Sequence, residues 1–317
     1  MHKKISLTLL LIVSLCMAVP SASRADEYTA FDFLRLEMNA RAAALGNAFV
    51  SMRGDPTIMF HNPGGLSTVP NGSLSIGFIK HLLDVNAGYA AYVHEMEGIG
   101  WVSGGVTYLN YGSFKRTDGS GNELGEFGAG DVAVSVGYGN FYENIHYGGS
   151  VKFIYSSIES ASASALAIDA GVTYVIPTEE IAISMSILNS GAELSPYGNI
   201  RESLPFEVRV GISKKLEHLP LLLNLNFHKL TEQEDNFGQH FAQFSIGGEF
   251  TLSEYVQARI GYNNERRKEM KTGTSAGLAG FSAGLGIKIS DYKFDYAFSS
   301  FGKIFDMHRF SLSTVIN

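Results

Sequence analysis

Cysteine is nearly absent from this chain of 317 residues, where Cys16 is the only one, and proline is scarce at 8 residues. Charged residues make up only 17% of the sequence, which is less than soluble enzymes usually carry. The composition excludes a disordered chain, because such chains combine high charge with few apolar residues. No linker, charge run or low-complexity stretch divides the sequence, so everything after the N-terminal signal is expected to be one folded unit.

Residues 1–25 have the pattern of a signal peptide that is removed from the mature protein. Lys3 and Lys4 precede the apolar run "ISLTLLLIVSLCMAV", and the small residues before Asp26 suit cleavage after Ala25. The sequence therefore predicts a secreted chain.

An anchor through Cys16 is the alternative, but a lipobox requires a small side chain where Leu15 stands. With Cys16 removed, the mature chain has no disulfide and no thiol chemistry. Without the three basic residues of the signal, 21 basic residues face 31 acidic ones, a formal charge of −10. This charge argues against nucleic acid as a partner.

Beyond the signal, no segment approaches the roughly 18 consecutive apolar residues that a transmembrane helix needs. The sequence instead alternates between apolar and polar residues, which indicates strands with two chemically different faces. In the stretch 204–213, Val208 and Ile212 alternate with Glu207 and Arg209. A half-buried sheet of a soluble protein gives the same alternation, so a single strand does not decide between the two.

The number of strands and their connections favour a membrane barrel. Fourteen alternating segments are expected at 72–80, 84–93, 98–110, 127–139, 144–156, 164–176, 181–189, 204–214, 220–229, 240–252, 255–263, 278–289, 291–299 and 308–316. Their connections alternate between tight turns and longer polar loops, of which the longer ones are 111–126, 157–163, 190–203, 230–239, 264–277 and 300–307. Even strand numbers, short periplasmic turns and long outer loops are typical of outer-membrane barrels. Only the first outer connection, "HLLD" at 81–84, is short where this rule predicts a long loop.

We therefore predict an all-β fold, a transmembrane antiparallel β-barrel of about 14 strands over residues 71–317, with both termini periplasmic. Glycines inside the strands relieve crowding on a curved wall or leave room inside the barrel. A soluble β-sandwich or propeller is the alternative, but its continuous apolar faces would need buried partners. Residues 26–70 are rich in turn residues and are predicted to form a plug or hatch in the lumen.

Three stretches resemble the PorV/PorQ family of outer-membrane proteins, which is related to the FadL long-chain fatty acid transporters. The first is "FDFLRLEMNARAAALGNAFVS" with Asp55 and "NPGGL", and the others are residues 108–139 and 204–230, which are more similar to the PorQ branch. The resemblance spans nearly the whole mature chain. It implies a FadL-like barrel whose hatch motif is structural and consists of Arg41, Gly46, Asp55, Asn62, Pro63 and Gly64.

The resemblance also implies a role at the outer membrane in type IX secretion. Members of this family are associated with the cell-surface attachment machinery, and a PorQ-like barrel anchors a surface protein there. The expected partners are outer-membrane lipids and PorZ-, PorU- and PorV-like proteins. The candidate partner-binding positions belong to the outer loop around 111–126 and are Lys115, Arg116, Asp118 and Glu123.

Motifs for enzymatic chemistry are lacking: no nucleophile elbow, zinc spacing, P-loop or dinucleotide fingerprint occurs. The inference is a non-enzyme with no cofactor and no metal site. His146 and Ser150 share the inward face of one strand, but residues four apart on a strand lie about 13 Å apart, too far to act as a pair. Arg41 and Asp55 are expected to form an ion pair between plug and wall.

Three functions remain open from the sequence. The first is an interaction protein whose outer loops hold a surface complex, and the second is a FadL-like transporter of hydrophobic small molecules. The third is a lipid-modifying enzyme, which the missing catalytic groups disfavour. A transporter needs an apolar path, whereas the predicted lumen faces carry the charges of Glu207, Arg209, Lys152, Asp295, Lys288 and Lys293.

Overall fold

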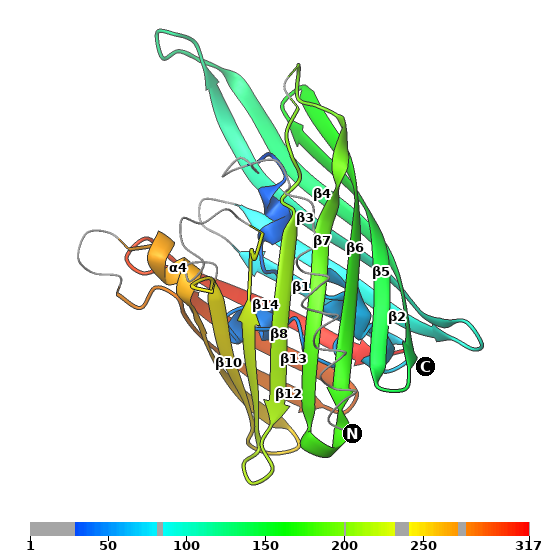
Figure 1. Cartoon of the computed structure of the whole chain (residues 1–317). Coiled ribbons are helices and arrows are strands. Elements are labelled where there is room, and N and C mark those ends of the chain that lie inside the picture. The colour runs from blue at the N-terminus through cyan, green and yellow to red at the C-terminus, as the bar shows by residue number, and fades with distance from the viewer. Residues whose placement is uncertain (1–28, 81–84, 200, 232–240, 272–276, 317) are drawn as a thin grey trace.

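The computed structural model describes residues 29–80, 85–199, 201–231, 241–271 and 277–316. Within them, fourteen antiparallel strands form a closed barrel in which each strand pairs with its neighbours along the chain and β1 pairs with β14 (Figure 1). The strands are β1 (Ser73–Lys80), β2 (Asn86–Met96), β3 (Gly100–Thr117), β4 (Glu123–Tyr142), β5 (Ile145–Ile158), β6 (Ala161–Ile176), β7 (Ile181–Ser195), β8 (Glu207–Lys215), β9 (Leu221–Phe227), β10 (Phe244–Thr251), β11 (Val256–Asn263), β12 (Phe281–Ile289), β13 (Tyr292–Ser300) and β14 (Asp306–Val315). The predicted fold class is confirmed. The predicted signal peptide lies outside the described residues.

The connections differ from expectation on one side of the barrel. Residues 111–126, expected as a long polar loop, are mostly strand, because β3 continues to Thr117 and β4 begins at Glu123. The expected loop 157–163 is likewise a tight turn between β5 and β6. The β3–β4 hairpin, teal in Figure 1, projects well beyond the rest of the barrel. These strand ends could not be recognised from the sequence because they are polar. A strand that extends beyond the membrane does not need an apolar face.

The barrel wall shows the alternation that the sequence indicates. Outward side chains are large, apolar and exposed, such as Val136 (65%), Ile168 and Ile260. Inward side chains are polar and buried, such as Asp169 and Arg259. An apolar exterior around a polar interior is the arrangement of a barrel surrounded by lipid. No helix in the described ranges is both long and apolar enough to span a membrane.

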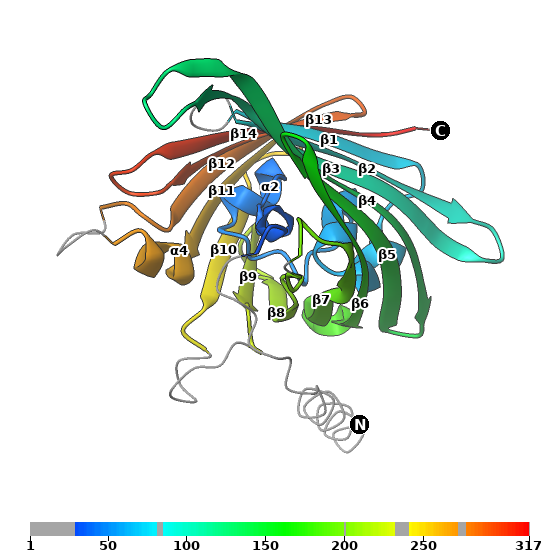
Figure 2. The same cartoon turned by 90° about the horizontal axis from the view of Figure 1, so that it is seen from above.

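Residues 29–70, named the plug here, lie inside the ring of strands (Figure 2). The plug consists of short helical turns and no strand: η1 (Asp32–Arg35), α2 (Ala40–Ala44), η2 (Pro56–Phe60) and η3 (Pro63–Thr68). Side chains cap three of these turns, because Asn39, Asp55 and Asn62 each accept a hydrogen bond from a backbone N–H at the start of the turn. Caps of this kind hold turns that are too short to be stable alone.

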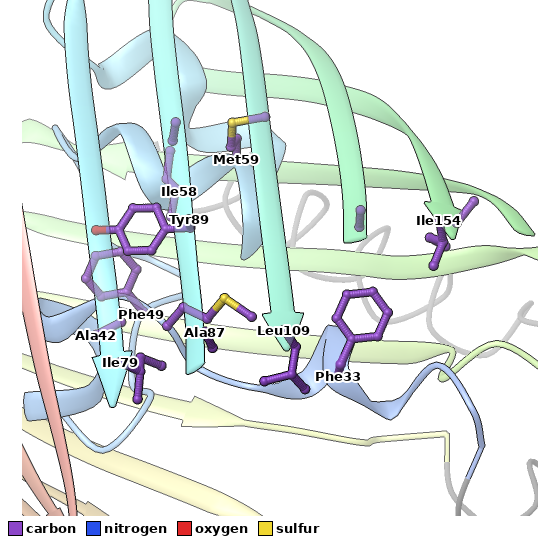
Figure 3. Packing of buried hydrophobic residues seen from close by; sticks show 14 of the residues in the cluster. Phe33, Ala42, Phe49, Ile58, Met59, Ile79, Ala87, Tyr89, Leu109 and Ile154 are labelled. Carbon is purple, nitrogen blue, oxygen red and sulfur yellow. The ribbon is translucent and has the colours of Figure 1, made fainter. Parts of the chain in front are cut away.

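The plug shares one hydrophobic core with the barrel wall. Phe33, Phe49, Ile58 and Met59 of the plug belong to the same buried cluster as wall residues such as Leu109 (Figure 3). Eight strands leave an interior just wide enough for side chains, so a barrel of this larger size needs such a filling segment. The plug is therefore packed as part of the barrel interior.

Candidate functional site

The plug is fixed to the wall by a chain of buried ion pairs that starts at Arg41. The Arg41 guanidinium donates from Nε and Nη2 to both carboxylate oxygens of Glu249 on β10, at 2.8 and 2.7 Å. Glu249 also accepts from Arg259 on β11 at 2.6 Å, and Arg259 pairs with Asp295 on β13 at 2.6 Å. Two-point arginine–carboxylate pairs combine energy with fixed geometry, so this network sets where the plug sits.

Asp55 ends the same network on the plug side. Its carboxylate lies 3.2 Å from Arg41 Nη1 and accepts from the backbone and hydroxyl of Thr57. Burial opposes the charge on each group, but the pairing outweighs it: the pKa of Asp55 is held below its ordinary value and that of Arg41 is raised. Both groups are therefore ionised at neutral pH.

The sequence predicts that Arg41 and Asp55 form an ion pair between plug and wall, but the residue that pairs with Arg41 from the wall is a different one. Arg41 and Asp55 do pair, but both belong to the plug, and the wall residue is Glu249. The sequence gives no distance between positions that lie about 200 residues apart. What it does show is a charged residue at an inward position of β10, which is a signal for an interior partner.

The Asn62-Pro63-Gly64 step lies against the wall opposite this network. The Asn62 amide donates to the Val50 carbonyl at 2.9 Å and to the Thr173 hydroxyl of β6 at 3.0 Å, while its oxygen accepts from the Gly64 N–H. A Cβ on Gly64 would lie 2.5 Å from the Gly171 backbone of β6. The motif thus has a steric reason: only glycine allows the two backbones to approach this closely.

The other glycine of the predicted motif makes the same kind of contact. Gly46 has a left-handed φ of 66°, and a Cβ there would lie 2.8 Å from the Tyr262 backbone of β11. On the wall, a Cβ on Gly148 or Gly261 would overlap the plug backbone, at Pro63 and at Gly46 respectively. Part of the glycine content of the strands therefore marks where the plug touches the wall.

A cavity of about 550 Å³ lies between the plug and the wall at the end of the barrel with the tight turns. Its apolar lining includes Met52, Val175 and Leu222, and its charged lining includes Arg53 and Lys215. This size is typical of small-molecule sites. Met52 and Leu222 also belong to, or pack against, the hydrophobic cluster that the plug shares with the wall, so the apolar core extends from Phe33 and Leu109 to the edge of this cavity.

The four candidate partner-binding residues are engaged by contacts within the β3–β4 hairpin and with the turn between β5 and β6. Lys115 forms an ion pair with Glu123, and Arg116 pairs with Glu159 in the next hairpin. Asp118 accepts three hydrogen bonds from the backbone of Ser120 and from the backbone and side chain of Asn122, which closes the turn. These residues stabilise the outer part of the β3–β4 hairpin, residues 111–126, which is named the arm here. Its exposed apolar side chains are Phe114 and Leu124.

His146 and Ser150 do not meet, as their spacing predicts. The His146 ring lies 2.8 Å from the Ser67 hydroxyl of the plug, whereas Ser150 donates to Asp169 at 2.9 Å. Within the described ranges, no three acidic, histidine or cysteine side chains are grouped as a metal site requires.

Comparison with known proteins identifies the fold. No family model matches the sequence, and no curated protein matches it. Among solved structures, a TodX deltaS2S3 mutant, a monoaromatic hydrocarbon channel, is similar with a TM-score of 0.53 at 13% identity, covering 87% of this chain and 96% of that one. A FadL homologue from Pseudomonas aeruginosa has a TM-score of 0.52 at 9% identity, covering 88% and 98%. The fold is thus that of FadL-like outer-membrane barrels.

Proposed function

We propose that this chain is an outer-membrane channel for small hydrophobic molecules that is closed by its plug. The observation that carries the proposal is the position of the plug inside the barrel, where it and the wall line a cavity of about 550 Å³ that includes the apolar side chains of Met52 and Leu222. In this proposal, movement of the plug extends the cavity through the barrel. The similar solved structures support this reading, because one of them is described as a hydrocarbon channel.

Five of the six lumen charges named from the sequence are paired, which weakens their argument against a hydrophobic permeant. Glu207 pairs with Arg209 at 2.6 Å, and Lys152 pairs with Asp169 at 3.2 Å. Asp295 belongs to the Arg259 network. Paired and hydrogen-bonded charges are fixed parts of the structure, so they are not free to interact with a permeant.

A disulfide that fixes the plug tests the proposal. A Cβ on Gly211 would lie 3.1 Å from the Cβ of Val50 in the plug, close to the roughly 3.5–4.5 Å found across disulfides. In cells that lack other channels of this kind, V50C/G211C should take up labelled toluene when reduced and lose most uptake when oxidised. The single variant V50C controls for the oxidant. Equal uptake in both redox states would show that the plug does not gate a permeant.

Anchoring of a surface protein is the second candidate, and the β3–β4 arm favours it. β2 pairs with β3 only as far as Asn110, so among the described residues no strand covers the outer edge of β3 from 111 to 117. Free strand edges bind extended segments of partners. In this proposal, the role in type IX secretion and the PorZ-like partner come from the family resemblance.

Replacing residues 113–127 by a short Asn-Gly hairpin tests the anchor. The barrel should still insert and remain heat-modifiable, because the arm lies beyond the pairing with β2. A PorZ-like protein should then appear in the medium, with toluene uptake unchanged. Retention of that protein at the surface would reject the anchor without affecting the channel proposal.

A further inference from the structure

A buried amide without a partner lies at the inner end of the cavity between plug and wall. Asn224 on β9 is 1% exposed, and among the described residues neither its Oδ1 nor its Nδ2 has a hydrogen-bond partner. Burial of an unpaired polar group costs free energy, and nearly all buried polar groups in folded proteins are paired. The side chain of Asn224 is therefore free to bind a ligand.

Other buried asparagines of the interior are bonded to the protein. Asn39, Asn62 and Asn189 each make at least two side-chain hydrogen bonds, with partners in the plug, in the wall or in both. Asn263 of β11 also uses both ends of its amide. Asn224 is thus an exception within an interior that otherwise satisfies its asparagines.

The register of the strands places this amide at the cavity. Leu222 lines the cavity, and Asn224, two residues further along β9, points to the same side of the wall. Directly opposite Asn224 on β8 lies Ser213, which also lines the cavity. On the other side, β10 has Gly247 opposite Asn224, which offers no side chain as a partner. The amide therefore borders the inner end of the cavity.

The plug supplies a second unpaired group beside Ser213. Ser51 is fully buried, and its hydroxyl has no hydrogen-bond partner among the described residues. The Ser51 carbonyl accepts from the Ser213 hydroxyl at 3.1 Å, and the next residue of the plug, Met52, lines the cavity. An amide offers both donors and an acceptor, and a hydroxyl can do either. Plug and wall thus present matched hydrogen-bonding groups at one place.

The rest of the cavity determines what kind of molecule these groups can bind. Arg41 and Glu249 line it as well, but they bind each other at 2.7 Å. Lys215 is exposed at the end of β8, next to the tight turn, and not at the inner end. Apolar surface comes from Met52 and Leu222, among others. The inner end therefore suits a neutral hydrogen-bonding group, and the remaining lining suits an apolar body.

We propose that Asn224 and Ser51 bind a neutral small molecule that carries a carboxamide or a hydroxyl group on an apolar body. The Asn224 amide donates to the oxygen of this group and accepts from its N–H or O–H, and the Ser51 hydroxyl adds a further hydrogen bond. The apolar body lies against Met52 and Leu222. As a site for a permeant, this proposal rests on the proposed channel function, whereas binding itself is independent of transport.

Calorimetry on the purified barrel in a neutral detergent, corrected for titration into protein-free detergent, tests the site with four probes of similar size: benzamide, benzyl alcohol, toluene and benzoate. Benzamide and benzyl alcohol should bind at least tenfold more tightly than toluene and benzoate. N224L should reduce the affinity for benzamide at least tenfold and leave that for toluene unchanged, and S51A should have a smaller effect of the same kind. S103A is the matched control, because Ser103 on β3 has an equally unpaired buried hydroxyl but does not line the cavity.

Three results would overturn the proposal: toluene binding as tightly as benzamide, benzoate binding as tightly as benzamide, or unchanged benzamide affinity in N224L. Heat-modifiability checks that each variant is folded, and N224A serves if N224L does not fold. Transport is scored separately. Equal uptake by V50C/G211C in both redox states, together with benzamide binding that depends on Asn224, rejects the channel and keeps the site, and the reverse pattern rejects only the site.

Discussion

Arg41 of the plug and Glu249 of β10 form a two-point ion pair with N–O distances of 2.8 and 2.7 Å, buried at the centre of the barrel. Glu249 is shared with Arg259, and Arg41 is shared with Asp55. The pair therefore joins two otherwise separate sets of charges, one in the plug and one in the wall. Its strength decides how firmly the plug is held.

Replacing Arg41 by Met should release the plug. Asp55 then loses its cation and Glu249 keeps only Arg259, and removal of one partner from a buried pair costs about 3–5 kcal/mol. Amide hydrogen exchange in Ala40–Ala44 should accelerate about 10²–10³-fold, because each 1.4 kcal/mol is a factor of ten. R53M is the matched control: Arg53 lies 3.7 Å from Glu180, both side chains are partly exposed, and such pairs contribute at most about 1 kcal/mol. Equal acceleration in both variants would contradict this role for Arg41.

Acidification should loosen the plug through His61. Burial holds the pKa of this imidazole below its ordinary value of 6.5, the effect of Arg209 adding to it and that of Glu37 opposing it. A base with a lowered pKa in the folded state is favoured in its neutral form. Its contribution to stability is complete above pH 6.5 and decreases as the pH falls toward the folded-state pKa.

The measurement is limited proteolysis of the plug at pH 7.5 and pH 5. Wild type should be cleaved faster at pH 5, and H61F, which cannot be protonated, should lose most of that difference. Asp55 has a lowered pKa, so its own contribution is lost only near and below its ordinary value of 3.8, outside this window. A pH effect of the same size in H61F would exclude His61 as its cause.

The lipid-facing wall gives a third prediction. Val136 on β4 is 65% exposed, and an arginine there should cost about 2–4 kcal/mol if the position lies near the middle of the membrane. Leu124 is 60% exposed but belongs to the arm, where water solvates a new charge. V136R should therefore reduce the free energy of unfolding in lipid vesicles, while L124R should change it by less than about 1 kcal/mol. Equal effects would place both residues in the same environment.

The fourteen strands were predictable from the sequence because each wall residue faces either lipid or the interior, and this alternation is visible locally. The extensions of β3 and β4 were not predictable, because the segment that contains Lys115 and Glu123 is polar and lacks the apolar face of a membrane strand. The pairing of Arg41 with Glu249 depends on where the plug lies inside the barrel, which brings together positions distant in sequence. The glycines within the strands did indicate crowded positions on the wall. That Gly171 contacts Asn62 could not be predicted, because this contact depends on where the plug lies.

A close approach of plug and wall at Gly171 gives the last prediction. A Cβ on Gly171 of β6 would overlap the Asn62 oxygen, which caps the turn of η3 and cannot move without losing its bond to the Gly64 N–H. G171A should therefore displace η3, open the path past the plug and raise toluene uptake several-fold. Gly104 on β3 is the matched control, since a Cβ there meets nothing within 4 Å and G104A leaves the plug untouched. If G171A and G104A give the same uptake, contact between Asn62 and the wall does not hold the channel closed. If G171A lowers the yield of folded barrel without raising uptake, the contact serves assembly and not gating.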